Sequence, residues 1–170
     1  FCNFVIENML QFDENGYLLP HDVLETTLDV FQAVFVDAFP ESETRRWLFD
    51  NYLDWIFDFQ RDIFPYFTQW IDGSFVTQKL NPKDIDFVTF LDGRVFEIKE
   101  KRKELDRFWS FSNEDKGLDG YLIADLSREH PDFSKIEKQK QIWRELYGHT
   151  RNAPLEPRLP KGFVQINFEK

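Results

Sequence analysis

Two short motifs in the stretch WIDGSFVTQKLNPKDIDFVTFL, residues 70–91, contain residue types that bind phosphates and metal ions. Gly73-Ser74 ends one apolar run, and after nine residues Asp84 and Asp86 open the next. Side chains two apart in a strand point the same way, so these two aspartates would project their carboxylates together. Two carboxylates close together among apolar residues repel each other unless a cation binds between them. Oxygen ligands of this kind suit Mg²⁺ or Mn²⁺.

The Gly-Ser pair supplies groups that hold an anion. Gly73 lets backbone N–H groups approach a phosphate, and Ser74 adds a hydroxyl that bonds a phosphate oxygen. Lys79 and Lys83 in the connection are candidates to contact a triphosphate, with ordinary solvated lysines as the alternative. The pattern therefore predicts a phosphate and metal site. The alternative for the two aspartates is a structural carboxylate pair at the start of a strand.

The Gly-Ser and Asp-x-Asp motifs at this spacing resemble the signature of the nucleotidyltransferase fold, the polymerase-β-like superfamily. The segments FDENGYLLP, LDGYLI, WRELYGHTR and PKGFVQI resemble a small, largely uncharacterised bacterial family of this fold, so the resemblance extends over most of the chain. It implies an α+β domain with a small mixed sheet and helices packed mainly on one face. It also implies a helical N-terminal region.

The resemblance further implies roles for individual residues. In the superfamily the Gly-Ser pair holds phosphates, the Asp-x-Asp aspartates hold two metal ions, and a third carboxylate on a neighbouring strand completes the site. The residues carried over are Gly73, Ser74, Asp84 and Asp86. We expect the third carboxylate to be Asp119, which opens the segment LDGYLIAD, with Asp125 at its far end as the alternative.

The expected function is metal-dependent transfer of a nucleoside monophosphate from an NTP to a hydroxyl group. A protein, a tRNA end or a small molecule such as an aminoglycoside would carry that hydroxyl. Small stand-alone members of the superfamily suggest a toxin–antitoxin or defence role with a protein partner. Arg151 is a further candidate for a phosphate contact, with a place on the acidic surface as the alternative. His149 is expected to cap the end of a helix, with a role as ligand or base as the alternative.

Periodicity predicts the elements that must position these residues. Apolar residues recur at helical spacing between Ser42 and Phe64 and form one face. Those residues are Leu48, Tyr52, Trp55, Ile56, Phe59 and Ile63. Strands are expected at 67–71, 84–91, 119–124 and 162–168, and helices at 28–36, 96–108 and 134–147, the last with Ser134 as its cap. We expect a single domain over 1–170, with a helical part at 1–65 and the core sheet at 66–170.

The opposite face of the 42–64 helix carries the acidic series Asp50, Asp54, Asp58 and Asp62. Like charges four apart repel by a few tenths of a kcal/mol per pair, which places them in water or opposite cations. A solvated face is one interpretation. The other is a surface that binds a basic protein partner, which leads to an alternative function: a non-catalytic module of the same fold that acts through this helix.

Composition narrows the classes of partner. The 170 residues carry a net charge of −10, so long nucleic acid is not expected as a ligand. A local basic patch is formed in the sequence by Lys79, Lys83, Lys99, Lys101, Arg102 and Lys103. The single cysteine, Cys2, excludes an internal disulfide, and no apolar run reaches the ~20 residues of a membrane span. The start of the chain lacks a basic stretch, so we expect no signal peptide and a cytoplasmic protein.

Overall fold

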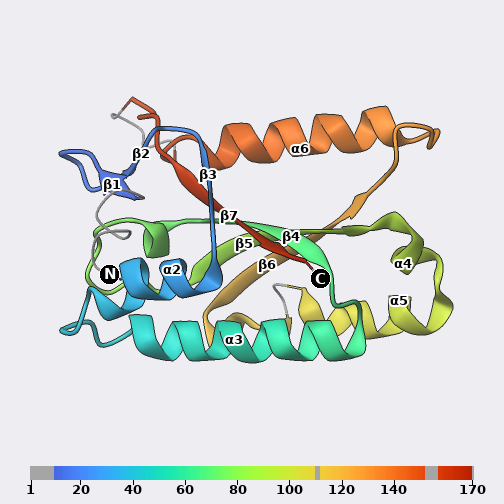
Figure 1. The fold of residues 1–170 in the computed structure, drawn as a ribbon, viewed down its shortest axis with the longest axis horizontal. Helices are drawn as coiled ribbons and strands as arrows, with labels where there is room; N and C mark the ends of the chain where they lie inside the picture. Colours follow the sequence, from blue (N-terminus) through green and yellow to red (C-terminus); the bar gives the residue numbers. More distant parts are fainter. Residues whose placement is uncertain (1–9, 110–111, 152–156, 170) are drawn as a thin grey trace.

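The computed structural model describes residues 10–109, 112–151 and 157–169, which form a mixed five-stranded sheet with helices on both faces (Figure 1). The strand order is β3-β7-β4-β5-β6. β3 and β7 run parallel, as do β5 and β6, whereas β4 is antiparallel to both of its neighbours. The strands are β3 (Val23–Thr26), β4 (Phe67–Asp72), β5 (Ile85–Asp92), β6 (Leu118–Asp125) and β7 (Phe163–Phe168). The mixed α+β class expected from the sequence is confirmed.

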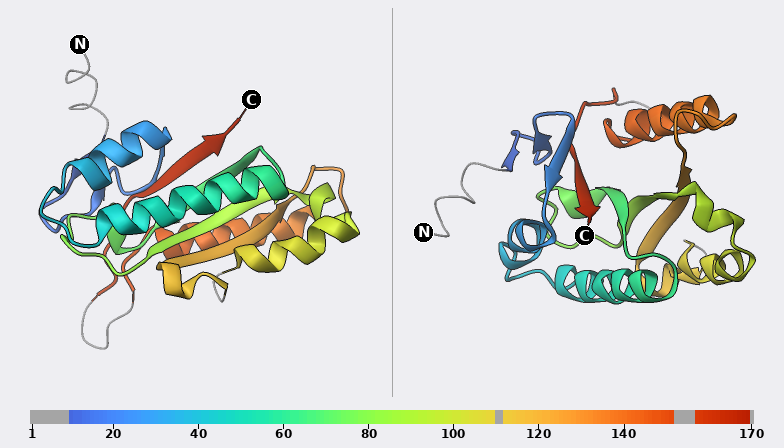
Figure 2. Two further views of the ribbon diagram at one scale, coloured as in Figure 1. Left: turned by 90° about the horizontal axis from the view of Figure 1, so that it is seen from below. Right: turned by 45° about the vertical axis from the view of Figure 1, so that its right-hand side comes forward.

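Among the described residues, a small hairpin and five α-helices complete the fold. The hairpin strands are β1 (Gln11–Phe12) and β2 (Leu18–Leu19), and the helices are α2 (Leu28–Gln32), α3 (Arg45–Asp62), α4 (Gly93–Glu97), α5 (Lys99–Leu105) and α6 (Phe133–Tyr147). Short turns of other helix types are η1 (Ala33–Asp37), η2 (Ser74–Val76), η3 (Asp106–Phe108) and η5 (Glu114–Lys116). Figure 2 shows α3 and α6 on opposite faces of the sheet.

The apolar face of α3 packs on one face of the sheet and forms the larger core, as predicted. All six residues of that predicted face are buried. The Phe87 ring of β5 meets the rings of Tyr52 and Trp55 at centroid distances of 5.5 and 4.9 Å. Burying an aromatic side chain of this size stabilises the fold by about 1.5–3 kcal/mol. These contacts therefore fix α3 against the strand that carries the Asp-x-Asp motif.

The other face of the sheet is covered only in part, by α6. A smaller core forms there from Val88, Phe90, Ile123, Tyr147 and Phe163. Because side chains alternate along a strand, Asp86 lies on the same face of β5 as Val88, and Asp119 lies on the same face of β6 as Ile123. The candidate carboxylates therefore stand on the face where α6 leaves part of the sheet open.

The predicted strands agree with β4, β5, β6 and β7 to within one residue at each end. The helical part predicted at 1–65 contains α2 and α3 but also strands, because the hairpin and the edge strand β3 lie in 11–26. Ser134 is not the cap of α6. The helix begins one residue earlier, where the carbonyl of Asp132 already accepts bonds from the N–H groups of Lys135 and Ile136. The helix predicted at 96–108 divides into α4, α5 and η3.

The expectations for Cys2 and for the start of the chain concern residues outside the described part. Among the described residues, no helix is both long and apolar enough to cross a membrane.

Candidate functional site

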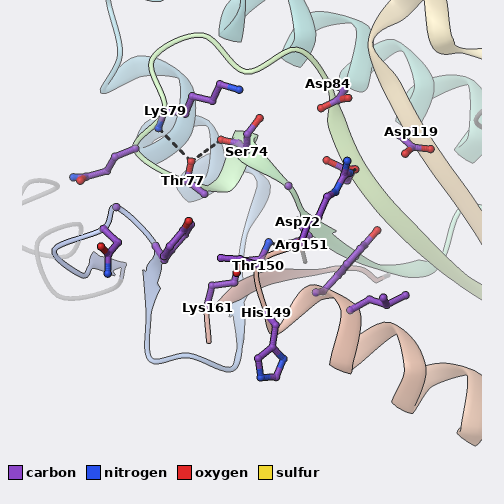
Figure 3. Close-up of a pocket in the computed structure, with 18 of the residues that line it drawn as sticks. Asp72, Ser74, Thr77, Lys79, Asp84, Asp119, His149, Thr150, Arg151 and Lys161 are labelled. Atoms are coloured by element: carbon purple, nitrogen blue, oxygen red, sulfur yellow. Dashed lines mark hydrogen bonds and ion pairs between the residues drawn. The ribbon is translucent and has the colours of Figure 1, made fainter. Parts of the chain in front are cut away.

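Three aspartates lie side by side on adjacent strands. Asp72 at the end of β4 pairs in register with Asp86 of β5, and Asp86 pairs with Asp119 of β6. Neighbouring strands are about 4.8 Å apart, so the three carboxylates form a row across the sheet. Asp84, two residues before Asp86, lies on the same face. All four line one cavity of about 1000 Å³ (Figure 3).

Gly73 connects the row to the Gly-Ser turn and has two reasons to be glycine. Its φ of +78° lies in the left-handed region that side chains disfavour. A Cβ atom at this position would also lie 1.8 Å from Oδ2 of Asp86, so the backbone passes directly beside that carboxylate. Ser74 then opens η2, where its carbonyl accepts a 2.8 Å hydrogen bond from the Thr77 hydroxyl. Both residues of the pair line the cavity.

A buried arginine holds the loop after this turn. The Nη1 of Arg45, at the start of α3, donates to the carbonyls of Phe35 and Phe75, both at 2.7 Å. Its Nη2 donates to the carbonyls of Thr77 and Lys79 at 2.8 and 2.6 Å. Burial lowers the pKa of Arg45 to about 10, which still leaves it charged near neutral pH. The buried Arg45 side chain thus fixes the loop that carries the candidate phosphate ligands.

The predicted basic residues divide between two places. Lys79 and Lys83 are exposed and line the cavity. The basic residues of the 99–103 segment do not line it, because they belong to α5 at the far end of the sheet (Figure 1). There Lys101 donates to the carbonyl of Asp62 and Arg102 to that of Phe96. The prediction of one basic patch around the motif is therefore wrong, and its α5 part serves local packing.

In the part of the chain that the structure describes, Lys161 and Arg151 contact aspartates of the row. Lys161 Nζ lies 2.5 Å from Oδ1 of Asp72, and both side chains are 9% exposed. Arg151 lies 3.1 Å from Oδ1 of Asp86, but its side chain is 89% exposed. The first pair is a buried structural contact, and the second is a surface contact that costs little to break.

Burial and mutual repulsion disfavour the charged form of aspartates in the row. Burial, followed by the like charges of Asp84 and Asp72, raises the pKa of Asp86 to about 6, while Arg151 opposes the shift. Burial also raises the pKa of Asp72, against the opposing charge of Lys161. Converging acids with raised pKa values in a cleft are typical of functional sites.

Comparison with known proteins identifies the chain's family. Residues 10–167 match the model of a family of unknown function, DUF6932. The chain belongs to this family. Neither the curated proteins nor the solved structures contain a match. What this family member does must therefore be argued from the geometry of its site.

The donor set of this site fits a hard divalent cation by its chemistry. Asp84, Asp86 and Asp119 offer only oxygen ligands. A positive charge between them would reduce the repulsion between the Asp86 carboxylate and the neighbouring carboxylates. In the described ranges, no group of three or more His, Cys, Asp or Glu side chains is already arranged to hold a metal ion. Closure of the carboxylates around a cation would require Arg151 to leave Asp86.

The alternatives named from the sequence are placed differently. Asp125 pairs in register with Asp92 at the far end of β6, about 20 Å along the strand from Asp119, and binds Lys140 at 2.7 Å. It does not line the cavity. The His149 ring contacts the carbonyl of Glu145 on α6, which is the helix-capping contact expected, and Figure 3 shows it directed away from Asp84 and Asp119.

Sequence reasoning missed four groups at the site. They are Asp72, Lys161, the buried Arg45, and the aromatic residues Tyr121 and Trp143 at the cavity wall. Asp72 had a local signal, because it immediately precedes Gly73 at the end of an apolar strand. The others had none, since a charged residue normally indicates surface and an aromatic residue normally indicates core.

Proposed function

We propose that this protein is a metal-dependent nucleotidyltransferase of the polymerase-β-like fold. It would move a nucleoside monophosphate from an NTP to a hydroxyl acceptor: the acceptor oxygen bonds to the α-phosphorus, and the bond to the β-phosphate breaks and releases pyrophosphate. One observation carries the proposal: the backbone of Gly73 passes against the carboxylate of Asp86, which stands in register with Asp119 on the next strand. A phosphate-binding turn, an Asp-x-Asp pair and a third acid on a neighbouring strand thus share one cavity.

In this proposal the turn and its loop hold the triphosphate. The hydroxyl of Ser74 and nearby backbone N–H groups would donate to phosphate oxygens. Lys79 and Lys83 are exposed at the cavity and would pair with the outer phosphates. Arg45 keeps this loop in position before the nucleotide arrives, which lowers the entropy lost on binding.

The carboxylates would hold the metal ions and the acceptor. Asp84, Asp86 and Asp119 are the expected ligands of Mg²⁺ or Mn²⁺, which when bound neutralise charge on the phosphates and polarise them for in-line displacement. Asp119 would in addition accept the proton of the acceptor hydroxyl through a carboxylate oxygen. Gly73 keeps the carboxylate of Asp86 beside the phosphate turn.

The acceptor is proposed to be a protein hydroxyl, a tRNA end or a small molecule such as an aminoglycoside. The net charge of −10 and the position of the α5 basic residues away from the cavity make RNA the poorest of the three. Modification of a protein partner in a toxin–antitoxin or defence system of the cytoplasm is the role that suits the proposal best.

The decisive experiment is thermal unfolding with each of the four NTPs, with and without Mg²⁺ or Mn²⁺. Wild type is compared with an Asp84→Asn/Asp86→Asn double variant, each against its own ligand-free melting temperature. A ligand at about 100 times its Kd stabilises a protein by roughly 2.7 kcal/mol. The proposal expects a shift that needs both NTP and metal and that disappears in the variant. A well-folded wild type that responds to no nucleotide would remove its support.

The α3 surface favours a second candidate, the non-catalytic module that binds a basic partner. Asp50 and Asp54 are exposed on α3, and two exposed aromatic residues, Trp47 and Phe57, lie on the same face of that helix. Exposed aromatic residues are enriched at protein-binding surfaces, and the acids beside them would attract a basic partner. Asp58 and Asp62 contribute less negative charge, because both pair with Arg61.

Co-purification distinguishes the two candidates. If the protein acts as a binding module, a basic partner will be captured by wild type and by Asp84→Asn but lost with Asp50→Asn/Asp54→Asn. If it acts as a nucleotidyltransferase, nucleotide binding will survive the α3 double variant and be lost with the Asp84 and Asp86 changes.

A further inference from the structure

The cavity of the candidate site has two chemically different ends. The row of aspartates lies between them. One end is the Gly73-Ser74 turn and its loop, with Lys79, while Lys83 lines the cavity next to Asp84. The other end is an aromatic wall formed by Tyr121 of β6 and by Trp143, Leu146 and Tyr147 of α6. No phosphate or metal role uses that wall.

The rings of the wall are held in fixed contact with one another. The Tyr121 and Trp143 centroids are 5.0 Å apart, and those of Trp143 and Tyr147 are 5.3 Å apart. Tyr147 is buried against Phe163 of the smaller core, at 5.9 Å. A chain of ring contacts therefore runs from the core to the cavity, so the wall is rigid before any ligand arrives.

Part of the wall nevertheless remains open. Leu146 is 53% exposed and Tyr121 is 36% exposed, although both are large side chains that line a cavity. Among the described residues, Leu146 belongs to no hydrophobic core cluster, although the adjacent Tyr147 does. Apolar and aromatic surface inside a cavity, as opposed to surface facing bulk water, is typical of a site for a flat organic ring.

The position of the wall relative to the aspartates indicates which ring. Asp119 and Tyr121 are two residues apart on the same face of β6, which separates them by about 6.6 Å along the strand. The turn follows Asp72 on β4, the aspartate row crosses β5 to Asp119 on β6, and Tyr121 lies beyond Asp119 along β6. Along this path the order is phosphate turn, aspartates, aromatic wall. A nucleoside triphosphate has the same order: outer phosphates, reacting α-phosphate, then ribose and base.

Resting on the proposed function, we propose that the Tyr121–Trp143–Leu146 wall is the nucleobase site of this protein. The base would stack on the Trp143 ring, and the apolar edge of Leu146 and the ring of Tyr121 would enclose it. Stacking on an aromatic ring tolerates every base, since each has a flat face. The wall therefore supplies affinity for the nucleoside, and the phosphate turn supplies affinity for the triphosphate.

The test compares each of the four NTPs with inorganic triphosphate, all with Mg²⁺, by calorimetric titration of the full chain. For the tightest-binding NTP, Trp143→Ala should weaken binding by roughly 5- to 150-fold, the usual range for one aromatic stack. Triphosphate affinity should stay unchanged. Trp143→Phe, which keeps a ring, should retain most of the NTP affinity. The matched control is Trp47→Ala, an exposed tryptophan on α3 that does not line the cavity.

Because Trp143 also contacts the smaller core, Leu146→Ala provides a variant whose folding is not at risk. It should weaken NTP binding several-fold with triphosphate binding intact. Wall variants that bind NTP as tightly as wild type would overturn the base site and leave the proposed function standing. Wall variants that lose NTP and triphosphate equally would assign the wall a purely structural role. A wild type that binds neither ligand would overturn the proposed function and the base site together.

Discussion

Replacing Asp86 by Asn should stabilise the metal-free protein, although Asp86 is proposed as a ligand. Asp86 is 8% exposed, and its pKa rises from 3.8 to about 6 in the folded chain because burial and neighbouring acids disfavour its charge. The native state therefore binds more protons than the unfolded state between these two values. Stability contributed by this group is present at low pH and is lost as pH rises through 6.

The magnitude follows from the shift. A pKa raised from 3.8 to about 6 corresponds to roughly 3 kcal/mol of destabilisation at pH 7.5. Asp86→Asn should remove most of it and raise the melting temperature by about 6–12 °C for a chain of this size. At pH 4, where Asp86 is protonated in the native state, the advantage should fall close to zero.

Urea unfolding at pH 7.5 and pH 4 in the presence of a chelator measures this effect. Asp50→Asn, on the exposed face of α3, is the matched control and should change the free energy of unfolding by less than about 0.5 kcal/mol at either pH. An Asp86→Asn variant no more stable than wild type at pH 7.5 would refute the reasoning. It would mean that the Arg151 contact already compensates the buried charge.

Three further substitutions test the framework of the site. Gly73→Ala should cost about 2 kcal/mol or more in urea unfolding, because of its positive φ and the contact with Asp86; a cost below about 0.5 kcal/mol would contradict that geometry. Arg45→Met should lower the free energy of unfolding by about 3–5 kcal/mol, since four carbonyls lose their hydrogen-bond donor. It should also accelerate amide hydrogen exchange in the 75–79 loop. Unchanged exchange there would show that the loop keeps its conformation without Arg45. Lys161→Met should lower the free energy of unfolding by about 3–5 kcal/mol, because it leaves Asp72 buried and unpaired. Adding Asp72→Asn should restore most of this stability. A double variant as unstable as the single one would count against the ion pair.

The parts of the fold that follow from local sequence were predictable. Helical spacing of apolar residues identified α3, and apolar runs bounded by turns identified four strands. The Gly-Ser and Asp-x-Asp motifs lie close in sequence, so their meeting in one cavity could be expected. Asp119 could be named only through a resemblance, because its place beside Asp86 depends on the parallel pairing of β5 and β6.

The missed features all depend on distant parts of the chain. β3 is four residues long and pairs with β7, far away in sequence, so its own residues carry little signal. Arg45 is buried because carbonyls from η1 and from the 75–79 loop converge on it, which its neighbours in sequence do not indicate. Lys161 likewise finds Asp72 only through the pairing of β7 with β4.

The place of β7 in the sheet has a consequence for how the protein forms during synthesis. β7 follows all the other described strands in sequence, yet it lies inside the sheet between β3 and β4. A chain leaving the ribosome can pair β4, β5 and β6 while the edge of β4 is still open and β3 has no partner. Open strand edges of this kind are prone to aggregate. The aspartate row is assembled at that stage without Lys161, which arrives just before β7, so closing the sheet and neutralising Asp72 occur in the same late step.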